Sequence, residues 1–261
     1  MQAILITGGG SGIGRAVAQL FAGKGWRVGL ADVDRGGLRD TAALLPAENT
    51  TTHQMDVRDP SEWEHVLDEF ARASGGRLDV MFNNAGIGLG GPFGELSLEA
   101  LDRVIDINFR GVAYGARMAY PYLKATPGSC LLNTASASAI YGSAGLAAYS
   151  ATKFAVRGLT EALDAEWAAE GIKVRSLMPG FVDTAILNTG IPGTNRTARD
   201  SVVDAGMEFT AVEDVAQAAW DAVHGNRVHA VIGKTARRLT FAARWMPGRV
   251  RRMMTARVLG R

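Results

Sequence analysis

The sequence predicts an α/β fold: a doubly wound, mainly parallel seven-stranded sheet with helices on both faces. Three observations support this prediction. Short runs rich in apolar and β-branched residues alternate strictly with longer helical patterns, an order that builds a parallel sheet. Continuous apolar stretches such as Ala3-Ile4-Leu5-Ile6 are typical of strands when helices cover both of their faces. The chain has 261 residues, 47% hydrophobic and 21% charged, which is enough for one large core.

Seven segments have the length and composition of strands. They are Ala3–Thr7, Arg27–Asp32, Thr51–Asp56, Leu78–Asn83, Ser129–Thr134, Lys173–Met178 and Val228–Ile232. Six segments with helical periodicity lie between them. They are Gly12–Lys24, Asp34–Leu45, Pro60–Ser74, Leu98–Lys124, Ala147–Glu170 and Val212–His224. We expect Ser97 and Thr210 to cap the helices that follow them, because a hydroxyl oxygen can accept from the free N–H groups of a first turn.

The region Pro179–Phe209 is rich in Gly, Thr and Asn and has no periodic pattern. A loop of this length inside a compact domain is usually functional. We therefore expect a single domain, residues 1–261, in three parts. These are a core of residues 1–232, a substrate loop or lid of residues 185–210, and a C-terminal extension of residues 233–261.

The extension carries an unusual charge. The net charge of the chain is only +2, but residues 233–261 contain nine basic residues and no acidic one, so the rest has 19 basic and 26 acidic residues. Val250, Met253, Met254 and Val258 recur near helical spacing among the arginines. This pattern indicates a basic amphipathic helix that packs on the body or on a second subunit, or binds anionic lipid or an acidic partner; the remaining alternative is a disordered tail. Nucleic acid is not expected, because the body is acidic and stacking aromatics are missing.

Cysteine content and apolar runs bear on location. The single cysteine, Cys130, rules out an intramolecular disulfide and favours a reducing, cytoplasmic setting. The first residues, Met1–Thr7, enter a strand directly, without the features of a signal peptide, and no apolar run is long enough to span a membrane. The four histidines lack metal-ligand spacing, so we expect no metal.

A glycine-rich turn joins the first strand to the first helix and reads Thr7-Gly8-Gly9-Gly10-Ser11-Gly12-Ile13-Gly14. Such glycines let the backbone approach a pyrophosphate, which binds at the helix N-terminus. Asp32 ends the second strand, where a carboxylate accepts hydrogen bonds from a ribose 2′-hydroxyl and repels a 2′-phosphate. Ser11 brings no positive charge to attract that phosphate. The pattern favours NAD over NADP; otherwise Asp32 is an ordinary turn residue at a strand end.

Further polar or turn-forming residues follow the other strands. They are Asp56-Val57, Asn83-Asn84-Ala85-Gly86, Ser136, and Pro179-Gly180. The carboxyl ends of parallel strands meet at one edge of the sheet, where open α/β sheets bind ligands. The sequence therefore predicts one cleft that all these segments line.

Tyr149 and Lys153 lie four residues apart in a predicted helix, so their side chains share one face. An ammonium beside a phenol favours the phenolate, which predicts a tyrosine pKa lowered toward neutrality. A phenol tuned in this way can serve as a general acid–base group. On its own the spacing also suits a pair on a helix surface.

Together these motifs resemble the short-chain dehydrogenase/reductase family over about Met1 to Gly233. The matching positions are Thr7, Gly8, Gly12 and Gly14; Asn83 to Gly86; Asn108; Ser136; Tyr149 and Lys153; and Pro179, Gly180, Val182 and Thr184. The resemblance implies a Rossmann-like, single-domain, NAD-type member. It also implies a homodimer or homotetramer formed through the helices that carry Asn108 and Tyr149.

The resemblance implies a role for each matching residue. Tyr149 would be the acid–base group and Lys153 would lower its pKa. Ser136 would donate a hydrogen bond to the substrate oxygen, and Asn108 would hold a water in a proton relay. The residues expected to contact the cofactor are Gly8, Ser11, Gly12, Ile13, Gly14, Asp32, Asp56, Val57, Asn84, Ala85, Gly86, Tyr149, Lys153, Pro179, Gly180, Val182 and Thr184.

Ser136, Ser138, Tyr141 and Tyr149 are the expected substrate contacts. The loops around them are mainly apolar, which favours a medium-sized apolar alcohol or ketone. We therefore expect an NAD(P)-dependent oxidoreductase that interconverts a secondary alcohol and a ketone and prefers NAD(H). The alternatives are an NADP(H)-dependent ketoreductase and a non-catalytic, dinucleotide-sensing regulator on the same fold.

Overall fold

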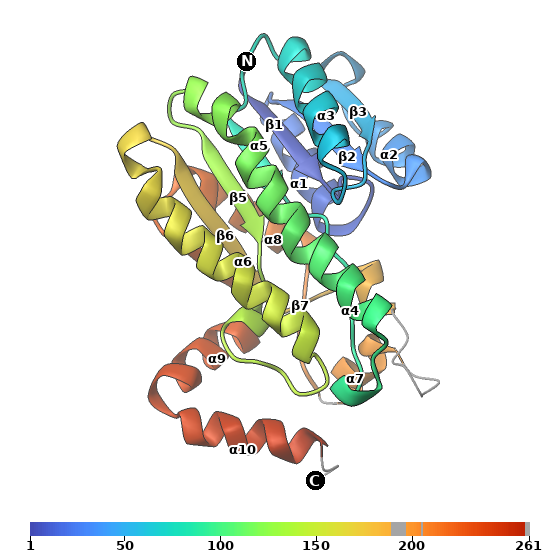
Figure 1. Ribbon diagram of the computed structural model, residues 1–261, viewed down its shortest axis with the longest axis vertical. Coiled ribbons are helices and arrows are strands. Elements are labelled where there is room, and N and C mark those ends of the chain that lie inside the picture. Colours follow the sequence, from blue (N-terminus) through green and yellow to red (C-terminus); the bar gives the residue numbers. More distant parts are fainter. Residues whose placement is uncertain (189–196, 205, 259–261) are drawn as a thin grey trace.

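The computed structural model describes residues 1–188, 197–204 and 206–258 of the chain (Figure 1). Its main sheet is parallel throughout, with the order β3-β2-β1-β4-β5-β6-β9. The strands are β1 (Ala3–Thr7), β2 (Arg27–Asp32), β3 (Thr50–Gln54), β4 (Val80–Asn83), β5 (Cys130–Thr134), β6 (Lys173–Pro179) and β9 (His229–Ile232). The predicted α/β class, the seven strands and their parallel pairing are confirmed.

Helices cover both faces of this sheet. The helices are α1 (Gly12–Gly23), α2 (Arg35–Ala42), α3 (Pro60–Ala73), α4 (Leu98–Ile105), α5 (Gly111–Ala125), α6 (Ala147–Glu166), α7 (Ala198–Asp204), α8 (Val212–His224), α9 (Lys234–Trp245) and α10 (Pro247–Val258). Alternate residues of β1 serve opposite faces, as the two-residue period of a strand requires. Ile4 and Ile6 pack in a core with α1 and α8, whereas Ala3 and Leu5 pack in a second core with α3 and α5.

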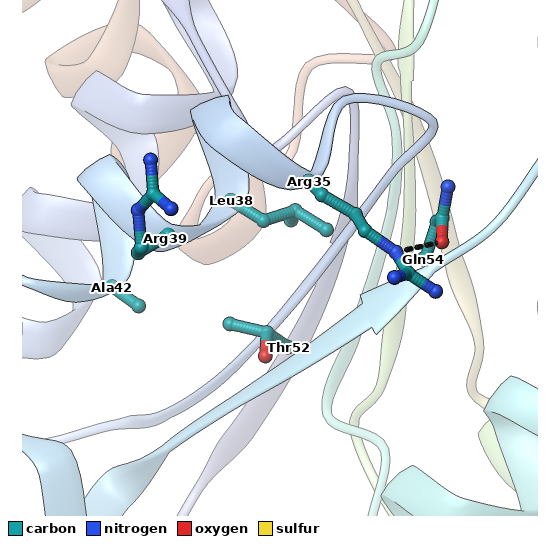
Figure 2. A pocket seen from close by; sticks show the side chains of 6 residues that line it. All are labelled: Arg35, Leu38, Arg39, Ala42, Thr52 and Gln54. Atoms are coloured by element: carbon teal, nitrogen blue, oxygen red, sulfur yellow. Dashed lines mark hydrogen bonds between the residues drawn. The ribbon is translucent and has the colours of Figure 1, made fainter.

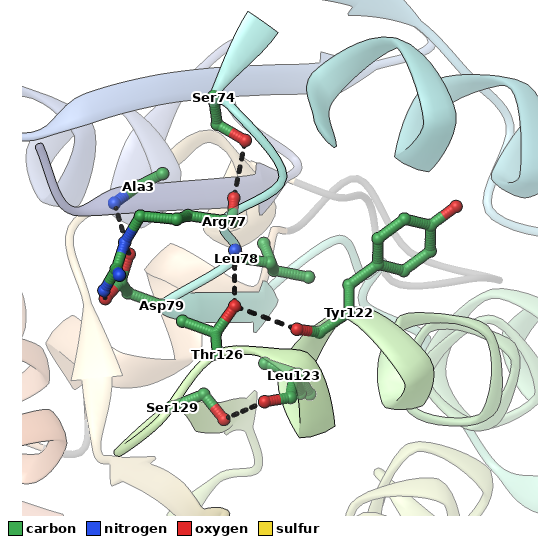
Figure 3. Close-up of polar contacts among 9 residues, drawn as sticks. All are labelled: Ala3, Ser74, Arg77, Leu78, Asp79, Tyr122, Leu123, Thr126 and Ser129. Carbon is green, nitrogen blue, oxygen red and sulfur yellow. Dashed lines mark hydrogen bonds and ion pairs between the residues drawn. The ribbon is translucent and has the colours of Figure 1, made fainter. Parts of the chain in front are cut away.

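Polar contacts fix the amino ends of the central strands (Figure 3). The buried Asp79 carboxylate accepts from the Ala3 backbone N–H at 2.9 Å and pairs with Arg77 at 2.6 Å. The Thr126 hydroxyl accepts from the Leu78 backbone N–H at 3.1 Å. These bonds tie β1, the start of β4 and the end of α5 together. They leave the opposite edge of the sheet free for a binding site.

The predicted helix Leu98–Lys124 is interrupted. A π-helical turn at Asp106–Arg110 separates α4 from α5 and holds the buried Asn108. Gly111 follows it, and a Cβ there would lie 2.8 Å from a methyl carbon of Val57. The π-helical turn changes the helical period over only five residues, so the sequence did not reveal the interruption. π-helical turns are frequent at functional sites.

The region Pro179–Phe209 is more regular than expected. Its described residues form β7 (Phe181–Val182), a 3₁₀ turn at Ala185–Asn188, the helix α7, and β8 (Phe209–Thr210), which pairs with β7. Residues 189–196 and 205 of the expected substrate loop lie outside the described residues. Thr210 does not cap α8, because it belongs to β8, and the N-cap residue is Ala211. Ser97 does cap α4, accepting from the Ala100 N–H.

The C-terminal extension forms two helices, α9 and α10, which contact each other and extend from the body in Figure 1. Gly233 joins β9 to α9 with a φ of +90°, and a Cβ at this position would lie 2.7 Å from the Thr210 hydroxyl oxygen. No helix in the described part of the chain has both the length and the apolar character that crossing a bilayer requires.

Candidate active site

The carboxyl ends of β1, β4 and β5 are bound together by side chains. The Thr7 hydroxyl accepts from the backbone N–H groups of Asn84 (2.9 Å) and Ala85 (3.1 Å). The Asn84 amide donates to the Thr7 carbonyl at 3.0 Å, and its oxygen accepts from the Thr134 hydroxyl at 3.1 Å. These bonds fix one rigid edge on which the predicted motifs sit.

The glycine-rich turn has the shape of a phosphate cradle. Gly8 and Gly12 have φ values of +66° and +50°, a region that favours glycine. A Cβ on Gly14 would lie 2.1 Å from the Gly8 carbonyl oxygen, so the first turn of α1 packs directly on the loop backbone. Within the described residues, α1 has neither a side-chain cap nor an acidic residue in its first turn. Its free N–H groups can therefore bind a pyrophosphate.

Asp32 is held at the edge of this cradle. Its carboxylate accepts from the Gly10 N–H at 2.9 Å and from the Asp34 N–H at 3.1 Å. These two bonds use one lone pair on each oxygen, so the carboxylate can still accept from ribose hydroxyl groups. The residues present therefore fit the adenosine half of a dinucleotide.

Other predicted cofactor residues have additional structural contacts. The Asp56 carboxylate pairs with Arg58, which lowers the pKa of that carboxyl group. Val57 is buried against Gly111, and its carbonyl accepts from the Trp63 indole at 2.9 Å. Both lie at the end of β3, as predicted, but packing and ion pairing account for much of their surroundings.

The segment after β6 approaches the glycine loop. Gly180 donates its N–H to the Ile232 carbonyl at 3.1 Å, which joins this segment to β9. The buried Val182 packs in the core between the sheet, α1 and α8. A Cβ on Gly12 would lie 3.1 Å from the Thr184 methyl carbon. Thr184 therefore lies against the phosphate cradle.

Asn108 fastens the loop that follows β4. Its side-chain oxygen accepts from the Ile87 N–H at 2.8 Å, and its amide donates to the Ile87 carbonyl at 2.9 Å. The same amide reaches the Thr152 hydroxyl on α6 at 3.5 Å. A Cβ on Gly86 would lie 3.2 Å from the Asn108 oxygen, so a glycine allows this close approach. The sequence predicted Asn108 but gave no indication of its bonds to Ile87 and Thr152.

Lys153 and Tyr149 lie side by side on α6. The Lys153 Nζ is 5.7 Å from the centre of the Tyr149 ring and donates to the Thr134 carbonyl at 2.8 Å. The Ser136 hydroxyl accepts from the Ser138 N–H at 3.1 Å and forms a hydrogen bond with Tyr149. The structure thus brings the four expected catalytic residues to the ends of β4 and β5. Thr134 was not among the predicted site residues, although its position at the carboxyl end of β5 could have indicated that it belongs to the site.

The predicted direction of the Tyr149 pKa is wrong for the protein without cofactor. Burial raises the pKa of Tyr149, and its hydrogen bond with Ser136 offsets this only in part. Burial also lowers the pKa of Lys153 to about 8, because the charged ammonium loses its hydration. The Lys153 ammonium donates a hydrogen bond to the Thr134 carbonyl, and among the described residues none to the phenol. The simple spacing argument omitted the cost of burying both groups.

The pKa of Lys153 predicts a pH-dependent stability. Its pKa falls from 10.5 to about 8 on folding, so between these values the unfolded state binds more protons. The contribution of Lys153 to the free energy of unfolding should therefore rise with pH, by up to about 1.36 kcal/mol per pH unit. Urea unfolding of the wild type and of Lys153→Met between pH 8 and 10 measures it. Parallel curves for the two proteins would contradict the lowered pKa.

Comparing the wild type with Lys153→Met cancels the contributions of other buried groups to the pH dependence of stability. Burial raises the pKa of Cys130 to about 12, which lowers stability as pH rises above the ordinary thiol pKa, but equally in both proteins. The raised pKa of Tyr149 lowers stability as pH approaches and passes the ordinary phenol pKa of 10, again in both proteins.

The residues that we expect to contact the substrate lie next to the catalytic residues. Ser138 is buried in a 3₁₀ turn at Ala137–Ala139, and Tyr141 is half-buried just beyond it. Leu187 and Val202 of the substrate loop are buried, whereas Val203 is 59% exposed. Arg199 forms an ion pair with Asp183, which joins α7 to the segment after β7.

A separate hollow lies between α2 and the edge strand β3 (Figure 2). Its lining residues are Arg35, Leu38, Arg39, Ala42, Thr52 and Gln54. The Arg35 guanidinium donates to the Gln54 side chain. The hollow is lined by none of the four expected catalytic residues, and β3 is separated from β5 by three strands of the sheet.

Comparisons with known proteins agree with this arrangement. The family described as short chain dehydrogenase matches residues 2–192. The meso-2,3-butanediol dehydrogenase of Serratia marcescens is 34% identical over 224 residues, which cover 82% of this chain and 88% of that protein. The putative oxidoreductase SadH of Mycobacterium tuberculosis is 32% identical over 260 residues, 97% of this chain and 94% of the relative.

Among solved structures, a short-chain dehydrogenase/reductase from Burkholderia phymatum in complex with NAD has a TM-score of 0.79 and 29% identity. The match covers 87% of each chain. The protein therefore belongs to the short-chain dehydrogenase/reductase family. It is an oxidoreductase that acts on CH–OH groups.

Proposed function

We propose that the protein interconverts a secondary alcohol and a ketone by hydride transfer and prefers NAD(H). The observation that carries this proposal is the gathering of Ser136, Tyr149 and Lys153 at the sheet edge that also holds the glycine cradle. The cofactor, when bound, supplies or accepts the hydride. The chain has to place a proton donor and a hydrogen-bond donor beside the reacting oxygen.

In this proposal Tyr149 protonates the carbonyl oxygen during reduction and removes the hydroxyl proton during oxidation. Ser136 donates a hydrogen bond to the same oxygen and stabilises the charge that develops on it. Lys153 lies beside the phenol and, below its pKa of about 8, favours the phenolate. Asn108 keeps the Ile87 backbone in place and connects it to α6 through Thr152.

The proposed preference for NAD(H) rests on Asp32. Its carboxylate is fixed by two backbone N–H groups at the end of β2. A 2′-phosphate at that point would meet a negative charge, and exposed Ser11 offers no compensating cation. Related structures contain NAD or NADH according to their descriptions, which supports this preference.

Repulsion between the Asp32 carboxylate and a 2′-phosphate should cost NADP at least about 1.4 kcal/mol of binding, which is a factor of ten. We therefore expect kcat/KM of the wild type to be at least about tenfold higher with NAD than with NADP. Asp32→Ala should bring the two values together, because NAD loses a hydrogen-bond acceptor for its ribose and NADP no longer meets the negative charge. The measurement is cofactor absorbance during turnover of a panel of alcohols and ketones. An unchanged NAD/NADP ratio in Asp32→Ala would contradict the role given to this carboxylate.

The same panel tests the substrate class. The described side chains of the substrate loop include the buried, apolar Leu187 and Val202, and Ile140 packs with the core near Ser138. These contacts support a medium-sized apolar alcohol or ketone. Turnover of small charged substrates with none of apolar alcohols would contradict this proposal, while leaving the reaction type intact.

A further inference from the structure

The surface formed by α9 and α10, here called the basic tail, has a one-sided charge. Its described basic side chains are all exposed. They are Lys234, Arg237, Arg238, Arg244, Arg249, Arg251 and Arg252. Within the described residues, no ion pair involves any of these side chains. These seven described side chains therefore present their positive charge to the surroundings.

Large apolar side chains lie among these charges. Phe241 is 60% exposed and Trp245 is 65% exposed; they are four residues apart, on one face of α9. Met253 on α10 is 49% exposed. Arg244 lies over the Trp245 ring, 5.3 Å from its centre. The exposed face thus combines aromatic and thioether groups with guanidinium groups.

These exposed groups are not the packing face of the helices. Val250 and Met254, four residues apart on α10, are 2% and 8% exposed, and α9 and α10 contact each other. Val250 and Met254 therefore lie on the buried side of α10, and the strongest helix contact of α10 is with α9, within the tail itself. Phe241, Trp245 and Met253 remain outside that contact.

We propose that the basic tail docks the protein on an anionic lipid surface. Helices with arginines beside exposed aromatic and aliphatic groups bind at bilayer interfaces, where apolar groups enter the headgroup region and cations meet lipid phosphates. A nucleic acid would match the arginines and the two aromatic rings, but the acidic body, with 19 basic and 26 acidic residues, would repel it. A tail-to-tail contact with a second copy would bring like charges together.

The tail lies at the end of the molecule that the carboxyl edge of the sheet faces. The strands start near the N-terminus and run in parallel toward the end where the C-terminus, α7 and α10 lie (Figure 1). The carboxyl edge of the sheet, with Ser136 and Tyr149, faces that same end. Docking by the tail would turn this edge toward the lipid, and the acidic body away from it.

Co-sedimentation of the full chain with lipid vesicles tests the proposal. We expect binding to vesicles of phosphatidylcholine with 30% phosphatidylserine, little binding to phosphatidylcholine alone, and loss of binding in 1 M salt. Arg237→Glu with Arg238→Glu should weaken binding at least about 25-fold, since each basic residue contributes about fivefold. Phe241→Ser with Trp245→Ser should weaken it at least about tenfold.

A matched control comes from the far side of the body. Arg39→Glu with Leu44→Ser removes an exposed arginine and an exposed leucine near α2 and should leave vesicle binding unchanged. Circular dichroism and analytical ultracentrifugation of each variant check fold and subunit state. Equal loss in the control, or no anionic preference in the wild type, would overturn the proposal. So would tail variants that change only the subunit state, which would make the tail a contact between copies.

Discussion

Replacing Tyr149 with phenylalanine is expected to lower kcat by about 10²- to 10⁴-fold, the range over which a positioned acid–base group contributes. The substitution removes one hydroxyl and keeps the ring beside Lys153, so the packing of α6 should survive. The Kd for NAD should stay within about threefold, since the cradle that holds the pyrophosphate lies on α1. Steady-state kinetics and cofactor titration by fluorescence measure the two effects separately.

Tyr122→Phe is the matched control. It removes a phenol hydroxyl that bonds Asp68, on α3, and whose pKa burial raises to about 12. This variant should keep the kcat of the wild type. Full activity in Tyr149→Phe would mean that another group transfers the proton, and equal loss in both variants would point to damaged folding.

The pH dependence of the reaction should depend on bound cofactor. Without cofactor, burial raises the pKa of Tyr149 and holds the phenol protonated at neutral pH. An oxidised nicotinamide bound in the cleft adds a positive charge to the site and favours the phenolate. Oxidation of an alcohol should therefore speed up as pH rises, whereas reduction of a ketone should not.

Gly14→Ala is expected to have the second largest effect, a loss of both stability and cofactor binding. Its Cβ would lie 2.1 Å from the Gly8 carbonyl oxygen, a backbone atom that cannot move without opening the turn. Overpacking of this kind costs about 1–3 kcal/mol of unfolding free energy. The displaced cradle should weaken NAD binding by at least about tenfold, because the N–H groups would no longer converge on one phosphate.

Gly23→Ala gives the same chemical change in the same helix. A Cβ on Gly23 would meet no atom within 4 Å among the described residues, and alanine has the higher helix propensity. We expect the melting temperature to stay level or rise, with NAD binding unchanged. Thermal unfolding and isothermal titration of both variants make the comparison. If Gly14→Ala behaves like Gly23→Ala, the cradle is not as tightly packed as the structure indicates.

The centre of the sheet could be predicted from the sequence because the strands there, such as β1 and β5, are buried along their whole length. A short apolar run such as Ala3-Ile4-Leu5-Ile6 is typical of a strand that helices cover on both faces. The site residues at strand ends followed from the same logic, since parallel strands deliver their carboxyl ends to one edge. Asn108, Ser136, Tyr149 and Lys153 are therefore close in space although they are far apart in the chain.

The features that the sequence did not predict depend on contacts between distant residues or on local helix geometry. The π-helical turn around Asn108 changes the helical period over only five residues, too few to alter the apolar pattern visibly. Thr210 matched a capping pattern, but its pairing in β8 with Val182 prevailed. The pKa of Tyr149 was misjudged because spacing reveals a neighbouring charge but not the burial of both groups.

The junction at Gly233 links two parts of the molecule mechanically. A side chain at Gly233 would collide with Thr210, so the residue that precedes α9 is packed directly against the strand β8. β8 is paired with β7, and the chain leaves β7 to reach Thr184 beside the phosphate cradle. Any displacement of the chain at Gly233 would therefore be shared by β8 and, through its pairing with β7, by the segment that reaches Thr184.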